Sequence, residues 1–210
     1  MSSGPTPGAI EVRPLEPGRV DAFLGFFDCD AFSDNAWWSG CYCNFYESLT
    51  HPAENPDPST AAFAPFRDHN RGEKVERVRS GRAHGFLAYR DGKVVGWLNA
   101  QPKEAYANPR RFAPAFAEIP ERTGMIMCFV VAPPARGQGV GTALLQAAIG
   151  SFRAAGLQQA QGFARRPDVK LEEWETFATS SYHGTLSMYL ENGFTEVGTL
   201  GSYVVMRRSL

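Results

Sequence analysis

The sequence predicts an α/β protein built as one domain. Three observations predict this class: a near-continuous apolar run typical of a buried strand, a glycine-rich turn leading from it into an amphipathic helix, and a hairpin that precedes both. With 210 residues, of which 43% are hydrophobic, the chain is long enough to bury one sizeable core. We expect residues 1–9 to be a flexible tail and residues 10–210 to form the single domain.

Charge and hydropathy argue against two classes of partner. The chain has 21 Lys and Arg residues against 22 Asp and Glu residues, so it offers no general field for a polyanion, and we expect no nucleic-acid partner. No uninterrupted apolar stretch approaches the roughly 20 residues that span a bilayer, so we expect no membrane partner. The N-terminus lacks the basic and apolar regions of a signal peptide, which predicts a cytoplasmic protein.

Before residue 81 the patterns predict a strand, helices and one irregular connection. Alternating polarity predicts a strand over Ile10–Arg13, and helical spacing of apolar residues predicts a short helix over Arg19–Phe27. The segment Cys29–Pro58 is interpreted as a structured but irregular connection, a class of segment that often lines binding sites. Ala61–Ser80 is compatible with one or two helices, which end at Gly81.

The four cysteines are too few for a disulfide framework, and we expect them to be reduced. Cys41 and Cys43 form a C-x-C pair whose thiols would share one face if the segment were a strand. Cys29 and His51 lie nearby, but the spacings match no familiar zinc pattern, so no metal site is predicted. A redox or substrate-pocket role and simple packing beside aromatic residues both stay open.

A hairpin and a long loop follow. Strand-like runs over Ala83–Tyr89 and Lys93–Ala100 flank Arg90-Asp91-Gly92, where Asp-Gly supplies the positive φ angles of a tight turn. Gln101–Arg122 contains four prolines and is interpreted as an exposed loop, with at most a helical turn, that is available to gate a site.

The most informative part of the sequence begins at Thr123. Thr123–Val131 has the apolar character of a strand buried on both faces, and the amphipathic helix that starts near Val140 closes at Gly156. Between them stands the glycine-rich turn, where free backbone amides, the helix dipole and the absence of side chains favour an anion. The turn should therefore hold a phosphorylated ligand.

The residues around the turn separate the ligand classes that use this device. A P-loop needs a lysine, and none occurs between Lys103 and Lys170. A dinucleotide fingerprint needs a sixth-position glycine, where Thr142 stands, and the strand-like run Gln158–Phe163 ends in no acidic residue. The pattern that remains is Arg-x-x-Gly-x-Gly over Arg136–Gly141.

That pattern resembles the pyrophosphate loop of the GNAT superfamily of N-acetyltransferases. Tyr189–Phe194 resembles the family's Tyr-x-x-x-Gly-Phe motif, and a final strand over Tyr203–Met206 also fits. The resemblance covers about Ile10–Arg207 and implies the GNAT fold, a strongly twisted mixed β-sheet flanked by helices on both faces. It also implies an acetyl-CoA-dependent N-acetyltransferase acting on a primary amine of a small molecule or peptide.

The resemblance implies a set of site residues. The strand before the loop would splay from its neighbour and offer backbone groups to the pantetheine arm and the thioester oxygen. Tyr189 matches the tyrosine that protonates the departing thiolate, and Arg136 would shape the turn. The implied cofactor-binding residues are Cys128, Phe129, Val130, Val131, Arg136, Gly137, Gln138, Gly139, Val140, Gly141 and Thr142.

One position departs from the family. Many members have an asparagine that contacts CoA seven residues before the tyrosine, but this chain has Tyr182 there, followed by His183-Gly184-Thr185. Ser181, Tyr182 or Ser187 could substitute for the asparagine. The general base is not identified by the sequence. The candidates are Glu104, Glu118, Glu121, His84, His183 and a chain of water molecules.

The acceptor side also stays open. Aromatic residues cluster around the C-x-C pair and form either an acceptor wall or core packing: Trp37, Trp38, Tyr42, Phe45 and Tyr46. Ala164–Ser180, with Trp174 and Phe177, is either part of that pocket or a surface turn. The oligomeric state is open, a homodimer included. Two alternatives to the enzyme remain: a catalytically silent module that binds acyl-CoA or a partner, and a thiol oxidoreductase using Cys41 and Cys43.

Overall fold

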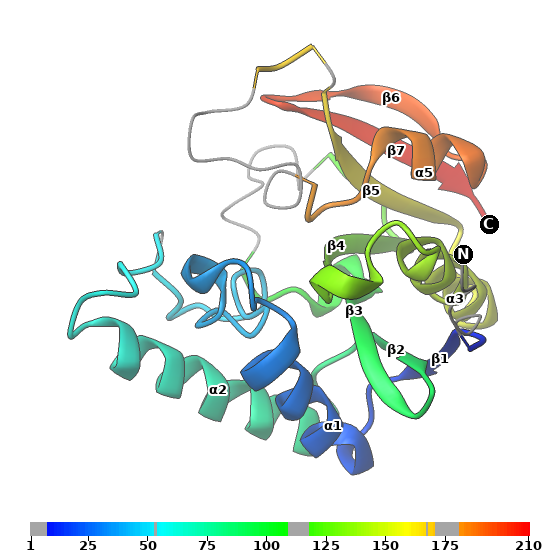
Figure 1. The fold of residues 1–210 in the computed structure, drawn as a ribbon. Coiled ribbons are helices and arrows are strands. Elements are labelled where there is room, and N and C mark those ends of the chain that lie inside the picture. Colours follow the sequence, from blue (N-terminus) through cyan, green and yellow to red (C-terminus); the bar gives the residue numbers. More distant parts are fainter. Residues whose placement is uncertain (1–7, 53, 109–117, 167, 171–180) are drawn as a thin grey trace, which may run out of the picture.

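The computed structural model describes residues 8–52, 54–108, 118–166, 168–170 and 181–210. Within these ranges the chain forms one sheet of seven strands with the order β1-β2-β3-β4-β5-β7-β6, accompanied by helices (Figure 1). The strands are β1 (Glu11–Pro14), β2 (Phe86–Arg90), β3 (Lys93–Pro102), β4 (Thr123–Val131), β5 (Gln159–Arg165), β6 (Thr195–Leu200) and β7 (Tyr203–Ser209). The α-helices are α1 (Val20–Gly25), α2 (Phe63–Arg79), α3 (Val140–Ala154) and α5 (Leu186–Glu191).

The sheet is mixed because one of its neighbouring pairs is parallel. β4 and β5 run parallel, and every other neighbouring pair is antiparallel. The parallel pair is joined by α3, which crosses over between the two strands. The predicted α/β class with a mixed sheet is therefore confirmed.

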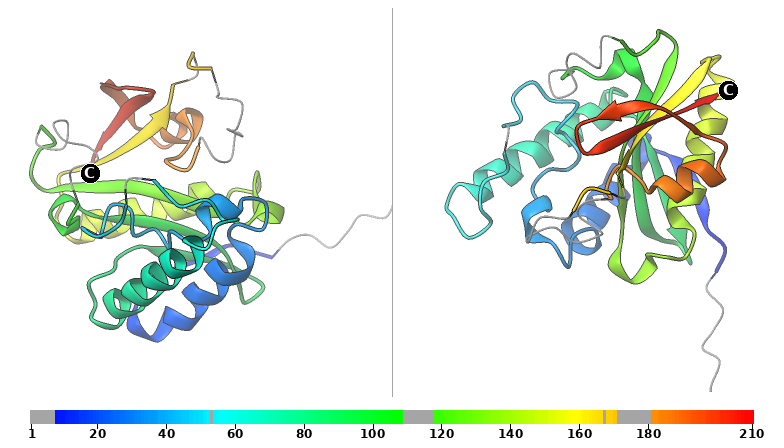
Figure 2. Two further views of the ribbon diagram at one scale, coloured as in Figure 1. Left: turned by 90° about the vertical axis from the view of Figure 1, so that its left-hand side faces the viewer. Right: turned by 90° about the horizontal axis from the view of Figure 1, so that it is seen from above.

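Helices cover both faces of the sheet, as predicted. On one face, α3 packs its apolar stripe, including Leu144 and Phe152, against strand residues such as Phe129, and α5 adds Tyr189. On the other face, α1 and the end of α2 pack against Trp97 and other strand residues. Figure 2 shows α1 and α2 together on one side of the strands, with α3 on the opposite side.

Most predicted elements lie where the sequence placed them. The turn of the β2–β3 hairpin has φ of 50° at Asp91 and 76° at Gly92, as the Asp-Gly pair predicts. The region Ala61–Ser80 contains one helix, α2, which ends before Gly81 at φ 70°. The helix α1 continues into a π-helical turn over Phe26–Asp30, slightly beyond its predicted end.

The C-x-C pair is not part of a strand. Tyr42 and Cys43 have φ angles of 47° and 53°, so the chain turns there, and the expectation based on strand spacing does not apply. The connection from Cys29 to Pro58 is irregular, as predicted, and includes the short helical turn Ala36–Trp38.

Several predictions fall wholly or partly outside the described residues. They concern residues 1–7 of the expected tail, residues 109–117 of the expected gating loop, and residues 167 and 171–180, which include Trp174 and Phe177. Among the described helices, none combines the length and apolar character needed to cross a membrane.

Candidate active site

The strands β4 and β5 part soon after they meet. Their parallel register covers only Thr123–Met125 on β4 and Gln159–Gln161 on β5. β4 continues to Val131, whereas β5 stays paired with β7 along its whole length. The second half of β4 therefore has β3 on one side and an opening on the other, which is the splay that the sequence resemblance implies.

Alternation along β4 decides which backbone groups face this opening. The amide of Ala132 donates to the Val95 carbonyl at 3.0 Å, and Val130 lies opposite Trp97, so residues 128, 130 and 132 direct their backbone groups toward β3. Phe129 and Val131 therefore direct theirs toward the opening. Of the four β4 residues implied by the resemblance, Cys128 and Val130 do not offer backbone groups to this side.

A segment from the far end of the chain lies in the opening. We call Ser181–Gly184 the bridging segment. The carbonyl oxygen of Tyr182 accepts from the Phe129 amide at 2.6 Å, and His183 Nδ1 lies 2.5 Å from the Met127 carbonyl oxygen. Tyr182 thus reaches β4 through its backbone, at the position where many family members have asparagine.

The protonation pattern of His183 follows from its contacts. A carbonyl oxygen can only accept, so Nδ1 carries the hydrogen, and Nε2 accepts from the hydroxyl of Tyr46 at a distance of 3.1 Å. Burial lowers the pKa of His183 to about 4, which keeps the ring neutral at pH 7. His183 is only 1% exposed and is therefore an interior residue of the site.

Tyr189 contacts the bridging segment through its hydroxyl group. Its hydroxyl donates to the carbonyl oxygen of His183 at 2.6 Å, and its ring packs against Phe194. A Cβ added to Gly162 on β5 would come within 2.3 Å of the Tyr189 hydroxyl oxygen, so only glycine admits the tyrosine here. Burial raises the pKa of Tyr189, and the hydroxyl keeps its proton at neutral pH.

The glycine loop, Arg136–Thr142, joins the end of β4 to α3. Gly137 and Gly139 have φ of 71° and 81°, and a Cβ built on either one meets no atom within 4 Å. The space beside both glycines is therefore open. The amide of Ala143 donates to the Gly139 carbonyl at 3.0 Å, so the helical amides before it point out of the helix end without a helical acceptor.

Side chains brace the glycine loop from two directions. Arg136 donates from Nε to the Val131 carbonyl at 3.1 Å and from its terminal nitrogens to Asp34 at 2.5 and 3.1 Å. The hydrogen bond from Arg136 lowers the pKa of the Asp34 carboxyl group. Gln138 accepts hydrogen bonds from the Arg90 guanidinium at its side-chain and backbone oxygens, and its side chain donates to the Pro134 carbonyl at 2.7 Å. Arg136 thus ties the loop to the open end of β4.

The other residues that the sequence offers as a general base or as an acceptor wall differ in their exposure to solvent. The carboxylates Glu104, Glu118 and Glu121 and the imidazole of His84 belong to exposed residues. Of the aromatic cluster, Trp37 is 51% exposed and Tyr42 is buried with its ring stacked on Phe27, whereas Trp38 packs against Tyr182 with ring centroids 4.9 Å apart. Within the described ranges, no group of three or more His, Cys, Asp and Glu side chains could hold a metal ion.

Solved structures resemble this one in fold. The PaiA N-acetyltransferase of Thermoplasma acidophilum, solved in complex with coenzyme A, has a TM-score of 0.53 at 15% identity, covering 96% of this chain and 99% of that chain. The Drosophila melanogaster polyamine N-acetyltransferase has a TM-score of 0.53 at 14% identity, covering 96% and 100%. A ribosomal-protein-alanine N-acetyltransferase from Brucella melitensis has a TM-score of 0.51 at 19% identity, covering 95% and 99%.

The family is identified by comparison of the sequence with family profiles. No curated protein matches the chain significantly. A profile of the acetyltransferase (GNAT) family matches residues 44–168, which is more than half of the chain and includes β4 and the glycine loop. Acetyl-CoA is the co-substrate of this family. The chain therefore belongs to the acetyltransferase (GNAT) family.

Proposed function

We propose that the protein transfers the acetyl group of acetyl-CoA to a primary amine of a small molecule or peptide. The observation that carries the proposal is the placement of an open, glycine-lined helix terminus beside the part of β4 that no longer pairs with β5. One element would bind phosphate groups and the other would bind the extended arm of the same molecule.

The glycine loop fits a pyrophosphate by its geometry. Backbone amides of Gly137, Gln138, Gly139, Val140, Gly141 and Thr142 would donate to the phosphate oxygens, and the Thr142 hydroxyl is available to add one bond. Open space beside Gly137 and Gly139 allows close approach. The dipole of α3 contributes about half a positive charge at this end.

The edge of β4 suits the amide groups of a pantetheine arm. An extended chain that lies along Phe129 and Val131 would pair with their backbone groups as an added strand does, in place of the present bonds to Tyr182 and Arg136. The thioester oxygen can accept a hydrogen bond from the Phe129 amide only if the hydrogen bond from that amide to the Tyr182 carbonyl is broken. Movement of the bridging segment is therefore part of the proposal.

The chemistry requires two proton transfers. The bound acetyl-CoA supplies an electrophilic thioester, which a neutral amine can attack. The amine must lose a proton, and the departing thiolate must gain one. Tyr189 is protonated because burial raises its pKa, and it would serve as the acid once its hydroxyl turns from the His183 carbonyl toward the sulfur.

An amine acceptor is supported by the activities of two proteins that share the fold. The Drosophila protein is a polyamine N-acetyltransferase, and the Brucella protein is a ribosomal-protein-alanine N-acetyltransferase. Both kinds of acceptor carry an amine. We also propose a cytoplasmic location, since all four cysteines are free, as is usual in a reducing compartment.

Two measurements test this function. Calorimetric titration with acetyl-CoA should show micromolar binding, while NADH and ATP under the same conditions should not bind. Thiol release should then depend on an added primary amine, and mass spectrometry should find the acetyl group on the amine. Binding of NADH or ATP in preference to acetyl-CoA would reject the proposal.

A catalytically silent acyl-CoA-binding or partner-binding module is the second candidate. The observation in its favour is that the protein's own Tyr182 carbonyl occupies the Phe129 amide. The two candidates differ in the second measurement. A silent module that binds acetyl-CoA would titrate normally and would release no thiol with any amine tested.

A further inference from the structure

Two cysteines from distant parts of the chain meet beside β4. The sulfur atoms of Cys43 and Cys128 lie 3.4 Å apart, although 85 positions separate them in the sequence. Cys128 belongs to β4, directly before Phe129, and Cys43 belongs to the irregular connection after α1. The acetyl transfer proposed above uses neither thiol.

The backbone around Cys43 adopts an unfavourable conformation that brings the two thiols together. Tyr42 and Cys43 are consecutive non-glycine residues in the left-handed region, with φ of 47° and 53°. The Tyr42 hydroxyl donates to Asp28 at 2.5 Å, and the Asn99 side chain donates to the Cys43 carbonyl at 3.3 Å. Such strain persists only where surrounding contacts hold it, and it concentrates at functional positions.

A buried polar network also holds the turn at Tyr42 and Cys43 in place. Asn99, which lies opposite Cys128 in the β3–β4 register, also donates to the buried carboxylate of Glu47 at 2.7 Å. That carboxylate is paired with Lys74 at 2.8 Å and with Arg77 at 3.0 Å. A buried ion network of this kind loses much of its stability when one member is displaced, so it fixes the turn relative to β4.

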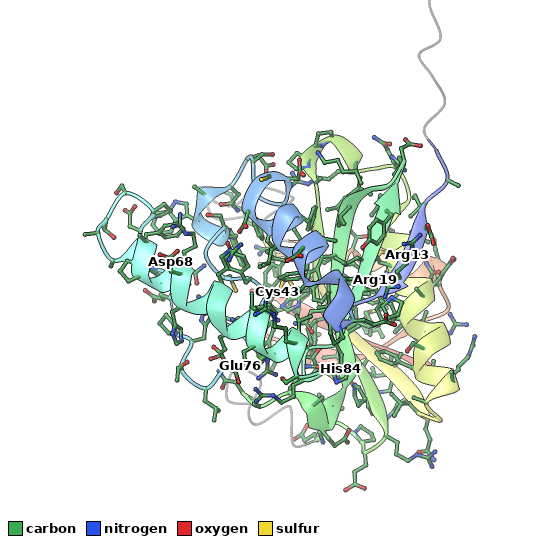
Figure 3. All side chains as sticks on the ribbon, turned by 90° about the horizontal axis from the view of Figure 1, so that it is seen from below. Arg13, Arg19, Cys43, Asp68, Glu76 and His84 are labelled. Carbon is green, nitrogen blue, oxygen red and sulfur yellow. The ribbon has the colours of Figure 1, made fainter. Side chains whose placement is uncertain are left out.

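The two thiols differ in their surroundings. Cys43 is 6% exposed, its burial raises the pKa of its thiol, and its S–H group donates to the Cys128 sulfur. Cys128 is only partly buried. A small oxidant would therefore reach Cys128 first, and Cys43 would act second, from within the protein. Figure 3 shows Cys43 in the interior, where α1 and α2 approach the strands.

We propose that Cys43 and Cys128 are a redox-modification site that forms a reversible disulfide in the presence of a peroxide. The Cys128 sulfur attacks a peroxide oxygen, the O–O bond breaks, and a sulfenic acid and one water molecule form. The Cys43 sulfur then attacks the Cys128 sulfur, the S–O bond breaks, and a second water molecule leaves. Two thiols and one hydrogen peroxide thus give one disulfide and two waters, and a small thiol reverses the step.

The geometry requires little movement. A disulfide has an S–S bond of about 2.05 Å, so the sulfurs must approach by about 1.4 Å from their separation of 3.4 Å. The bond would tie the turn that precedes Tyr46 to β4, next to Phe129 at the opening. Disulfide formation would occur whether or not the protein transfers acetyl groups.

The test uses the full chain, reduced and then freed of reductant. The protein is treated with a few equivalents of hydrogen peroxide, alkylated with iodoacetamide in denaturant and digested without reduction. We expect one cross-linked peptide pair containing Cys43 and Cys128, lighter by about 2 Da than the sum of the two free peptides. Dithiothreitol should remove the cross-link. The oxidised protein should melt at least about 5 °C higher, because the bond closes a long loop.

Matched variants separate this pair from the other cysteines. Cys41→Ser and Cys29→Ser should still form the cross-link, whereas Cys128→Ala should not. The wild-type result is decisive without any variant, so a misfolded variant does not weaken the test. Full alkylation of all four cysteines after peroxide treatment would overturn the proposal, as would a bond between Cys41 and Cys43 or irreversible oxidation of Cys128 alone.

Discussion

The glycine loop and the bridging segment meet the same open edge of β4 but are built in opposite ways. The loop adopts its shape through glycines with positive φ and through a helix that begins inside it. The bridging segment is placed by contacts with residues far away in the sequence, among them Met127, Phe129 and Tyr46. One site is encoded locally, and the other depends on the completed fold.

This difference indicates how each region should respond to mutation. In the proposed function the loop binds through backbone amides, so substitutions that fill its space or change its backbone should have the largest effect. The bridging segment is held by side chains and by burial, so removing a single hydroxyl or ring should alter it. In the proposed function the bridging segment moves on binding, because the Tyr182 carbonyl must release the Phe129 amide.

The largest effect is expected from Gly139→Glu in the glycine loop. The new side chain would enter the open space beside Gly139, in a backbone conformation that disfavours it, and would bring negative charge to the phosphate position. Affinity for acetyl-CoA should fall by more than about 1,000-fold, as measured by calorimetry.

Gly150→Glu is the matched control for this variant. Gly150 lies on the same helix, and a Cβ there also meets no atom within 4 Å. This control adds the same charge away from the loop and should leave the affinity unchanged. Retained affinity in Gly139→Glu would show that the loop is not the phosphate site.

Tyr189→Phe tests the bridging segment. The variant keeps the buried ring and removes the hydroxyl that donates to the His183 carbonyl. Turnover should fall by about 100-fold if the hydroxyl is the acid, while affinity for acetyl-CoA changes by less than about 2-fold. Steady-state kinetics at neutral and alkaline pH, together with calorimetry, measure both quantities.

The control for this variant is Tyr89→Phe, a half-buried tyrosine on β2. Because burial raises the pKa of Tyr189, the wild-type rate should show no alkaline decline from its titration below about pH 10. Unchanged turnover in Tyr189→Phe at both pH values would remove the residue from the mechanism. Loss of acetyl-CoA affinity instead of turnover would indicate a structural role.

His183→Asn tests whether burial holds the bridging segment. The folded pKa of His183 is about 4, below the value of 6.5 in an unfolded chain. As the pH falls from 6.5 toward 4, the unfolded chain binds a proton that the folded protein does not, and the free energy of unfolding decreases by up to about 3 kcal/mol. Asparagine can donate to the Met127 carbonyl but does not titrate.

Urea unfolding at several pH values between 4.5 and 7 measures this effect. The His183→Asn variant should lose most of the acid dependence, whereas His84→Asn, at an exposed position, should keep it. An identical pH dependence in wild type and His183→Asn would mean that another group controls acid stability.

The two regions also show what sequence alone could predict. The glycine loop, β4 and α3 were predictable because glycine spacing and apolar periodicity act over a few residues. The Tyr182 carbonyl on Phe129 and the buried ring of His183 were not, because no local pattern reports a contact between positions 127 and 183. The departure from the family at Tyr182 was the signal that this region differs.

The same limit applies to the cysteines. Cys41 and Cys43 attract attention because they are two residues apart, but the sulfur that contacts Cys43 is that of Cys128. Consecutive positive φ angles at Tyr42 and Cys43 turn the chain, and non-glycine residues seldom adopt them, so the shared face that a strand would give the two thiols is absent. The contact between Cys43 and Cys128 is visible only in the folded structure.

The smallest effect is expected from Asp34→Asn, which weakens the brace on the glycine loop. Asp34 is paired with Arg136, and their side chains are 44% and 35% exposed, so solvent screens the interaction. Stability should fall by no more than about 1 kcal/mol, and acetyl-CoA affinity by less than about 5-fold. Asp168→Asn, which alters a similar exposed pair with Arg166, is the control. A loss as large as that of Gly139→Glu would mean that the arginine brace, rather than the glycine amides, shapes the site, and the loop would then depend on distant contacts as the bridging segment does.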